Sequence, residues 1–207
     1  MFSTITSGAI HGIDSYLTFV EVDVAQALPG FDMVGFLSIE VREARERVRV
    51  ALKNAGITLP PVRITVNLSP ANIRKEGSAF DLPIAIGILT SLGYIPKEYM
   101  DNTVVIGELG LAGEVKPVNG ILPIVMEAAK RGYKRCIVPS GNAAEGAVIQ
   151  NIEIIGVLDL NQTLAYLAAP EKQKNEMIAP TIIDTEALFW NQLENGEGEN
   201  YGVIYDF

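Results

Sequence analysis

The chain has 207 residues, of which 48% are hydrophobic and 20% are charged, so it can bury a globular core and is not an intrinsically disordered protein. No apolar run approaches the roughly 20 residues that a membrane helix requires, and the single cysteine, Cys136, excludes an intramolecular disulfide and fits a reducing, cytoplasmic environment. The net charge is −9, but residues 171–207 hold eight acids and two lysines, whereas residues 42–75 hold eight bases and two acids.

The first half of the chain predicts strands around one helix. Residues 9–24 alternate in polarity around a Gly-Ile-Asp-Ser break, which indicates a hairpin, and residues 28–35 (LPGFDMVG) predict a turn and a short strand. Ser38 is the expected N-cap of a helix that Gly56 ends. Residues 62–68 (VRITVNL) predict the next strand.

Strands and helices alternate in the second half of the chain, which predicts an α/β class with a mixed sheet. The expected order is a helix over 79–92, two strands over 103–118 around a Gly110–Gly113 turn, a helix over 121–131, a strand over 134–139, a short helix over 143–148, a strand over 153–157 and a helix over 160–168. The predicted core domain is residues 1–170. Residues 171–207 are expected to be an acidic linker with a short helix near 186–193.

Metal and nucleotide chemistry find no support in the residues. The single His11 and Cys136 are far apart in sequence, so no zinc-type ligand set is expected, and Cys136 is interpreted as a buried small hydrophobe. The G-x-x-x-x-G-K-[ST] loop that binds nucleotide phosphates is absent. Neither a metal nor a cofactor is therefore expected on this chain.

The stretch RKEGSAFDLPIAIGIL, residues 74–89, raises the question of a serine nucleophile. Ser78 would need a neighbouring base, and only Lys75 or Lys116 could serve as the lysine of a Ser-Lys pair. Lys75 is expected in a charged loop where its ammonium stays protonated. The favoured interpretation is that Gly77 and Ser78 form a turn and cap at a helix N-terminus, although a Ser-Lys hydrolase remains the alternative.

The basic zone offers a second possible function. Arg42, Arg45, Arg49 and Lys53 share one stripe of the predicted helix over 38–56 and could contact nucleic-acid phosphates. Glu43 and Glu46 can pair with these arginines on a merely solvated face. We favour the solvated face for this helix.

Two long motifs, NLSPANIRKEGSAFDLPIAIGIL and GELGLAGEVKPVNGILPIVMEAAKRGYKRCIVP, occur in an order that resembles the proteolytic domain of Lon. Together with the opening HGIDSYLTFVEVDVAQALPGFDMVG, they are closer still to the N-terminal domain of the ComM/YifB family of magnesium-chelatase-like ATPases. The resemblance covers roughly residues 1–170. It implies a Lon-like fold of the ribosomal protein S5 domain 2-like superfamily.

The comparison with Lon implies a degenerate site. Ala79 stands where Lon has its catalytic serine, and Leu122 follows Asn119, Gly120 and Ile121 where Lon has its catalytic lysine. Ser78 lies one position away, which turns a helical side chain by about 100°. The resemblance therefore implies a domain without proteolytic activity. Asp81 after Phe80 is similar to the Lon-like domain of RadA, which serves binding.

The family also implies partners. A ComM-like parent protein would be a hexameric ATPase that acts in DNA branch migration during natural transformation, with ATP and Mg²⁺ bound by a module outside these residues. This domain would then contribute to ring assembly or DNA binding, and a purely structural oligomerisation module is a further alternative. Arg74, Lys75 and Lys116 are the preferred phosphate contacts, because related Lon-like domains keep positive charge around this loop.

Overall fold

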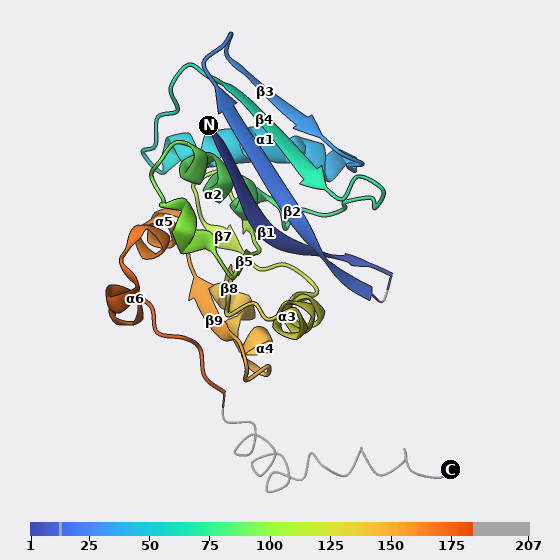
Figure 1. Cartoon of the computed structure of the whole chain (residues 1–207), viewed down its shortest axis with the longest axis vertical. Helices are drawn as coiled ribbons and strands as arrows, with labels where there is room; N and C mark the ends of the chain where they lie inside the picture. Colours follow the sequence, from blue (N-terminus) through green and yellow to red (C-terminus); the bar gives the residue numbers. More distant parts are fainter. Residues whose placement is uncertain (13, 184–207) are drawn as a thin grey trace, which may run out of the picture.

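A computed structural model describes residues 1–12 and 14–183 of the chain (Figure 1). They form a seven-stranded mixed sheet of order β3-β4-β2-β1-β5-β8-β9, a separate β6-β7 ribbon, and helices on both faces of the sheet. The predicted α/β class with a mixed sheet is confirmed. The strands are β1 (Phe2–His11), β2 (Asp14–Ala25), β3 (Gly30–Val34), β4 (Arg63–Ser69), β5 (Thr103–Val105), β6 (Glu108–Leu109), β7 (Val115–Lys116), β8 (Arg135–Pro139) and β9 (Glu153–Val157).

Antiparallel and parallel pairs occupy different parts of the sheet. The predicted hairpin is confirmed, because β1 pairs antiparallel with β2 in a register that runs from Phe2 opposite Asp23 to His11 opposite Asp14. β2 also pairs antiparallel with β4, whereas β3–β4, β1–β5, β5–β8 and β8–β9 are parallel. The side chain of His11 lies outside the described part of the chain.

The helices are α1 (Ile39–Asn54), α2 (Asp81–Ser91), α3 (Ile121–Lys130), α4 (Ala143–Ala147), α5 (Leu160–Ala168) and α6 (Glu171–Met177), with 3₁₀ turns at Lys97–Met100 and Ser140–Asn142. The predicted cap of α1 is confirmed, since the Ser38 hydroxyl accepts a hydrogen bond from the Val41 amide at 3.4 Å. Gly56 adopts a φ of +82° just past the end of α1, which suits a residue without a Cβ.

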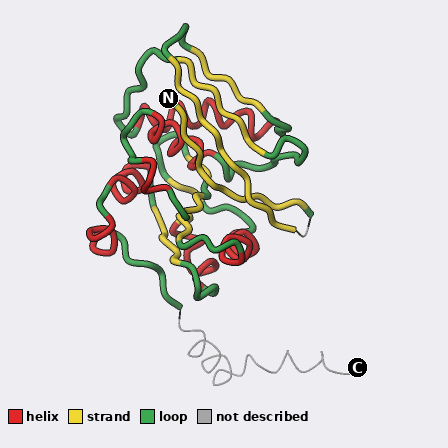
Figure 2. The backbone as a smooth tube through the Cα atoms, in the orientation of Figure 1, coloured by secondary structure: helices red, strands yellow, loops and turns green. Residues whose placement is uncertain are grey.

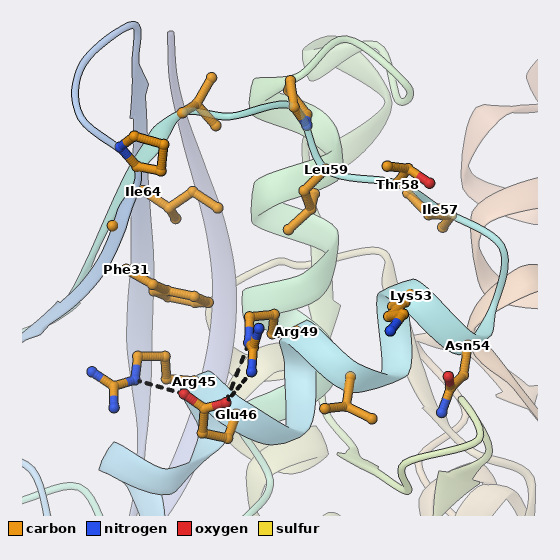
Figure 3. A pocket seen from close by; sticks show the side chains of 15 residues that line it. Phe31, Arg45, Glu46, Arg49, Lys53, Asn54, Ile57, Thr58, Leu59 and Ile64 are labelled. Carbon is orange, nitrogen blue, oxygen red and sulfur yellow. Dashed lines mark hydrogen bonds and ion pairs between the residues drawn. The ribbon is translucent and has the colours of Figure 1, made fainter.

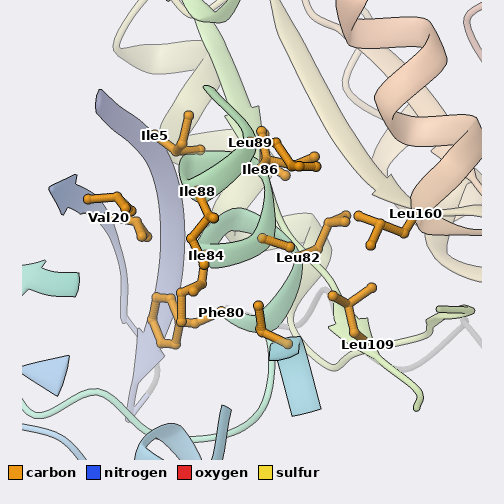
Figure 4. Close-up of a cluster of buried hydrophobic side chains, with 14 of the residues drawn as sticks. Ile5, Val20, Phe80, Leu82, Ile84, Ile86, Ile88, Leu89, Leu109 and Leu160 are labelled. Atoms are coloured by element: carbon orange, nitrogen blue, oxygen red, sulfur yellow. The ribbon is translucent and has the colours of Figure 1, made fainter. Parts of the chain in front are cut away.

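Helices cover both faces of the sheet (Figures 1 and 2). On one face α1, α2 and α5 share a buried apolar cluster with alternate residues of the strands, and α2 lies at its centre with all of its residues buried. Figure 4 shows Ile84 and Ile88 of α2 directed toward Val20 of β2. On the other face α3 and α4 pack on Cys136 and Val138. Full burial of each large aliphatic side chain contributes about 1.5–3 kcal/mol to the stability of the fold, so α2 is a major contributor to that stability.

Cys136 is buried, as predicted, and its burial raises the pKa of the thiol to about 12. The protonated thiol therefore packs as a small apolar group. None of the described helices is long and apolar enough to cross a membrane.

Three sequence expectations differ from the structure. Residues 103–118 form three short strands rather than two, because β5 joins the main sheet while β6 and β7 form their own ribbon around the predicted Gly110–Gly113 turn. Helix α2 begins at Asp81 with no side-chain cap, so Ser78 does not cap it. Residues 171–177 form a helix that the sequence did not indicate. The expected helix near 186–193 lies outside the described residues, and the domain boundary at 170 stays a prediction.

Candidate functional site

A cavity of about 550 Å³ lies where the resemblance to Lon places the degenerate site. Its walls come from the hairpin end of β1, the loop that precedes α2, the β6 ribbon and the loop that precedes α3. The lining residues that matter for chemistry are Glu76, Gly77, Ser78, Ala79, Glu108 and Asn119. Gly77 has a φ of +78°, which allows the sharp turn that brings Ser78 to the cavity.

The Ser78 hydroxyl faces a carboxylate rather than an amine. Ser78 Oγ donates a hydrogen bond to Glu108 Oε2, and Glu108 belongs to the first strand of the β6-β7 ribbon. Within residues 1–12 and 14–183, no hydrogen bond joins Ser78 to Lys75 or Lys116. A serine nucleophile requires a base that takes its proton while leaving the oxygen free to attack. An acidic carboxylate that holds this hydroxyl does not supply an activated pair of the Ser-Lys kind.

Lys75 has an environment that the sequence did not predict. Its side chain is fully buried, and its ammonium donates hydrogen bonds to the carbonyl oxygens of Ile73, at 2.8 Å, and Pro70. The backbone of Lys75 also exchanges hydrogen bonds with the segment before α1, at 2.8 Å to Phe36 O and 2.9 Å from Ser38 N. Burial lowers the pKa of the Lys75 ammonium. The sequence predicted a charged loop with a protonated lysine but not the burial of this side chain, and an ammonium bound to two carbonyls is not available to a phosphate.

Ala79 and Leu122, the two positions where the resemblance to Lon predicts a degenerate dyad, carry aliphatic side chains in different surroundings. Ala79 lines the cavity, whereas Leu122 is not among the residues that line it. The Leu122 amide donates to Glu145 Oε1 at 3.0 Å, so a carboxylate of α4 satisfies the N-terminus of α3. Gly120, with a φ of +81°, turns the chain into that helix. A hydrogen bond stabilises the backbone at Leu122, but neither the Ala79 nor the Leu122 side chain can donate or accept a proton.

The start of α2 is fixed by an ion pair that sequence reasoning missed. Arg47 Nε and Nη2 of α1 donate to the two carboxylate oxygens of Asp81, at 2.7 and 2.9 Å. Asp81 is fully buried and also accepts from the Leu109 amide at 3.3 Å. Burial raises the pKa of the Asp81 carboxyl, and the Arg47 guanidinium opposes that rise. The available signal was a lone carboxylate opening the apolar segment DLPIAIGIL, since such a group needs a cationic partner.

The candidate phosphate contacts are mostly paired with carboxylates. Arg74 lies 3.3 Å from Glu76, and Lys116 Nζ lies 3.7 Å from Glu114. Both pairs are about half exposed, so they are weak and can exchange partners.

On α1, Arg45 and Arg49 share Glu46, at 3.4 and 2.8 Å, which confirms half of the expected pairing. Glu43 instead lies 3.8 Å from Arg47. Arg42 is exposed and has no ion-pair partner among the described residues. The stripe is therefore only partly neutralised.

The donor set of the described residues does not fit a resident metal. Within residues 1–12 and 14–183, no group of three or more His, Cys, Asp or Glu side chains is placed to hold an ion. The sequence does not contain the G-x-x-x-x-G-K-[ST] loop.

Comparison with known proteins defines the class. Residues 20–142 match the family described as subunit ChlI of Mg-chelatase. The chain is 36% identical over 166 residues to the competence protein ComM of Haemophilus influenzae, an alignment that covers 80% of this chain and 32% of that protein. It is 36% identical over 186 residues to YifB of Escherichia coli, covering 90% of this chain and 36% of that protein.

A third similarity, 38% identity over 112 residues, is to the DNA repair protein RadA of Halalkalibacterium halodurans and covers 54% of this chain and 24% of that protein. The fold and these matches define a magnesium-chelatase-like domain. The chain belongs to the ComM/YifB family within that class. It spans about a third of the length of the ComM and YifB relatives.

Proposed function

We propose that this chain is the Lon-like, non-catalytic N-terminal domain of a ComM/YifB-type AAA+ ATPase, with the ribosomal protein S5 domain 2-like fold. The single observation that carries the proposal is the chemistry of the cavity. Ala79 stands where the resemblance to Lon puts the nucleophile, while the neighbouring Ser78 hydroxyl is bound to Glu108 and the buried Lys75 ammonium is bound to carbonyls. Such a cavity has no activated nucleophile and therefore cannot form an acyl intermediate.

The domain then acts by contact, in ring assembly or in DNA binding during branch migration in natural transformation. The names of two relatives, a competence protein and a DNA repair protein, support a DNA-related role. ATP and Mg²⁺ belong to the ATPase module implied by the family, and the proposed site of action is cytoplasmic, in a homo-oligomer such as a hexamer.

Arg74 and Lys116 are the proposed DNA contacts, since each flanks a loop of the cavity. Arg74 lies two residues before Glu76, and Lys116 lies immediately before Pro117, both of which line the cavity. Their ion pairs are exposed, so a phosphate can replace the carboxylate partner at little cost. Lys75 leaves this set because its ammonium is buried.

The test measures DNA binding by fluorescence anisotropy at several salt concentrations. The double variant Arg74→Ala/Lys116→Ala is expected to bind a labelled duplex more weakly. The slope of the logarithm of its binding constant against the logarithm of the salt concentration should fall in magnitude by about two, since each phosphate contact contributes about 0.9. The matched control is Lys97→Ala/Lys130→Ala, which removes two exposed lysines elsewhere. Equal salt slopes for the two double variants would remove Arg74 and Lys116 from the proposal. Sedimentation without DNA separates binding from a purely oligomeric role.

A further inference from the structure

A cavity of about 700 Å³ forms a groove between helix α1 and the edge strand β3, remote from Ser78. Its floor is apolar, with Phe31 from β3, Ile64 from β4 and Leu59 from the loop that follows α1. One rim is cationic, with Arg45, Arg49 and Lys53 of α1. Figure 3 shows Phe31 and Leu59 directed into the space above α1 and the arginines rising from the helix beneath them.

We propose that this groove binds an extended acidic peptide segment of a partner protein. The proposal concerns a surface separate from the cavity and does not depend on the proposed DNA contacts. Its three supports are the spacing of the cations, the free edge of β3 and the position of Glu46.

The cations match the repeat of an extended peptide. Arg45, Arg49 and Lys53 follow one another at intervals of four residues, which places them about 6 Å apart along the axis of α1. Alternate side chains of an extended strand lie about 6.6 Å apart on one face. Alternate side chains on one face of a bound peptide can therefore each lie beside one residue of this rim, while the intervening apolar side chains face Phe31 and Leu59.

Strand β3 supplies backbone groups for such a peptide. It is an edge of the seven-stranded sheet and pairs only with β4 among the described residues. An edge strand leaves a row of N–H and C=O groups that an extended peptide can pair with. Only Gly30 and Phe31 of β3 reach the groove itself, so the contact would be made at this end of the strand.

Glu46 favours a peptide over a nucleic acid. This carboxylate lines the groove between Arg45 and Arg49 and pairs with both. A nucleic acid carries a phosphate at every nucleotide, so it would add negative charge beside Arg45 and Arg49, which Glu46 already neutralises in part. A peptide can instead place a neutral side chain there and an acid beside Lys53, which has no ion-pair partner among the described residues.

The probe is a short fluorescein-labelled peptide in which glutamates alternate with valines around a central phenylalanine. Anisotropy is measured with the full chain, and the variant Arg45→Glu/Lys53→Glu is expected to bind about tenfold more weakly. Arg42→Glu is the matched control, because Arg42 is exposed on the same helix but does not line the groove, and it should stay within about twofold.

One further measurement completes the test. Amide resonances of residues 30–34, 57–59 and 62 should shift on titration, which locates the peptide in the groove. Three outcomes would overturn the proposal. The first is no binding of the peptide up to about millimolar protein, and the second is equal or tighter binding of the same peptide with lysines in place of glutamates. The third is that an oligothymidylate binds more tightly than the acidic peptide and that Arg45→Glu/Lys53→Glu abolishes this binding.

Discussion

Arg47 of α1 and Asp81 of α2 form a bidentate ion pair that joins the two helices on one face of the sheet, with the Asp81 carboxylate fully buried. The pair lies at the start of the helix that follows the Ser78 loop, so it fixes the direction in which that loop approaches the cavity. A third hydrogen bond, from the Leu109 amide, ties the β6-β7 ribbon to the same carboxylate. Three segments far apart in sequence therefore meet at one side chain.

Removal of Arg47 tests this role. Arg47→Ala leaves a buried carboxylate without its partner, and such a loss lowers the free energy of unfolding by about 3–5 kcal/mol. Urea denaturation followed by circular dichroism measures it. Arg49→Ala is the control on the same helix, because its ion pair is exposed and contributes about 0–1 kcal/mol. Equal losses for the two variants would show that the buried pair does not hold the helices together.

Replacement of Gly87 in α2 by alanine is predicted to destabilise the fold. A Cβ at this position would lie 2.6 Å from Cγ2 of Val22, a stiff side chain buried in β2. Overpacking costs about 1–3 kcal/mol, which exceeds the gain of up to about 1 kcal/mol that alanine brings to a helix.

Thermal unfolding should therefore show a lower midpoint for Gly87→Ala than for the parent chain. Gly30→Ala is the matched control, since its Cβ would meet nothing closer than 3.9 Å. An unchanged midpoint for Gly87→Ala would mean that β2 moves away without cost.

Lys174 is predicted to anchor helix α6. Its side chain is only 1% exposed, and its ammonium lies 5.0 Å from the ring centre of Tyr99 and 5.6 Å from that of Tyr166. Loss of these contacts in Lys174→Ala should lower the free energy of unfolding by about 1–3 kcal/mol. Lys172→Ala, on the exposed side of the same helix, should change it by less than about 0.5 kcal/mol. Identical denaturation curves for the two variants would contradict the anchoring role.

Glu171 should make stability depend on acid. A hydrogen bond from Arg135 lowers the pKa of this carboxyl to about 2, from an ordinary value of 4.5. Between these values the unfolded chain binds the proton that the folded chain releases, so this contribution is complete above the unfolded pKa and is lost as the pH falls toward 2. The Glu171→Gln variant should lose less stability over that pH range than the parent chain. A parallel pH dependence in both would show that Glu171 is not linked to folding.

Local signals predicted most elements of the fold, whereas the contents of the site depended on long-range contacts. The Ser38 cap is encoded within the first turn of α1, and the sequence predicted it. Burial of Lys75 could not be predicted, because it requires the carbonyls of Pro70 and Ile73 to converge on the ammonium after folding.

Side-chain contacts between distant parts of the chain could not be predicted either. Arg47 and Asp81 are 34 residues apart, and Ser78 and Glu108 are 30 apart. Neither distance is set by a helical or strand repeat, so the sequence offered the charged groups without their partners. The resemblance to Lon identified Ala79 and Leu122 but carried no information about which side chain would hold the Ser78 hydroxyl.

The most direct measurement is the intact mass of the full chain after incubation with a serine-reactive phosphonate, with a known serine hydrolase labelled in the same tube. We expect no adduct on Ser78, because its hydroxyl is bound to Glu108 and, within residues 1–12 and 14–183, no hydrogen bond joins it to a lysine amine. An adduct on Ser78 that Ser78→Ala abolishes, together with cleavage of an unfolded polypeptide, would contradict the account.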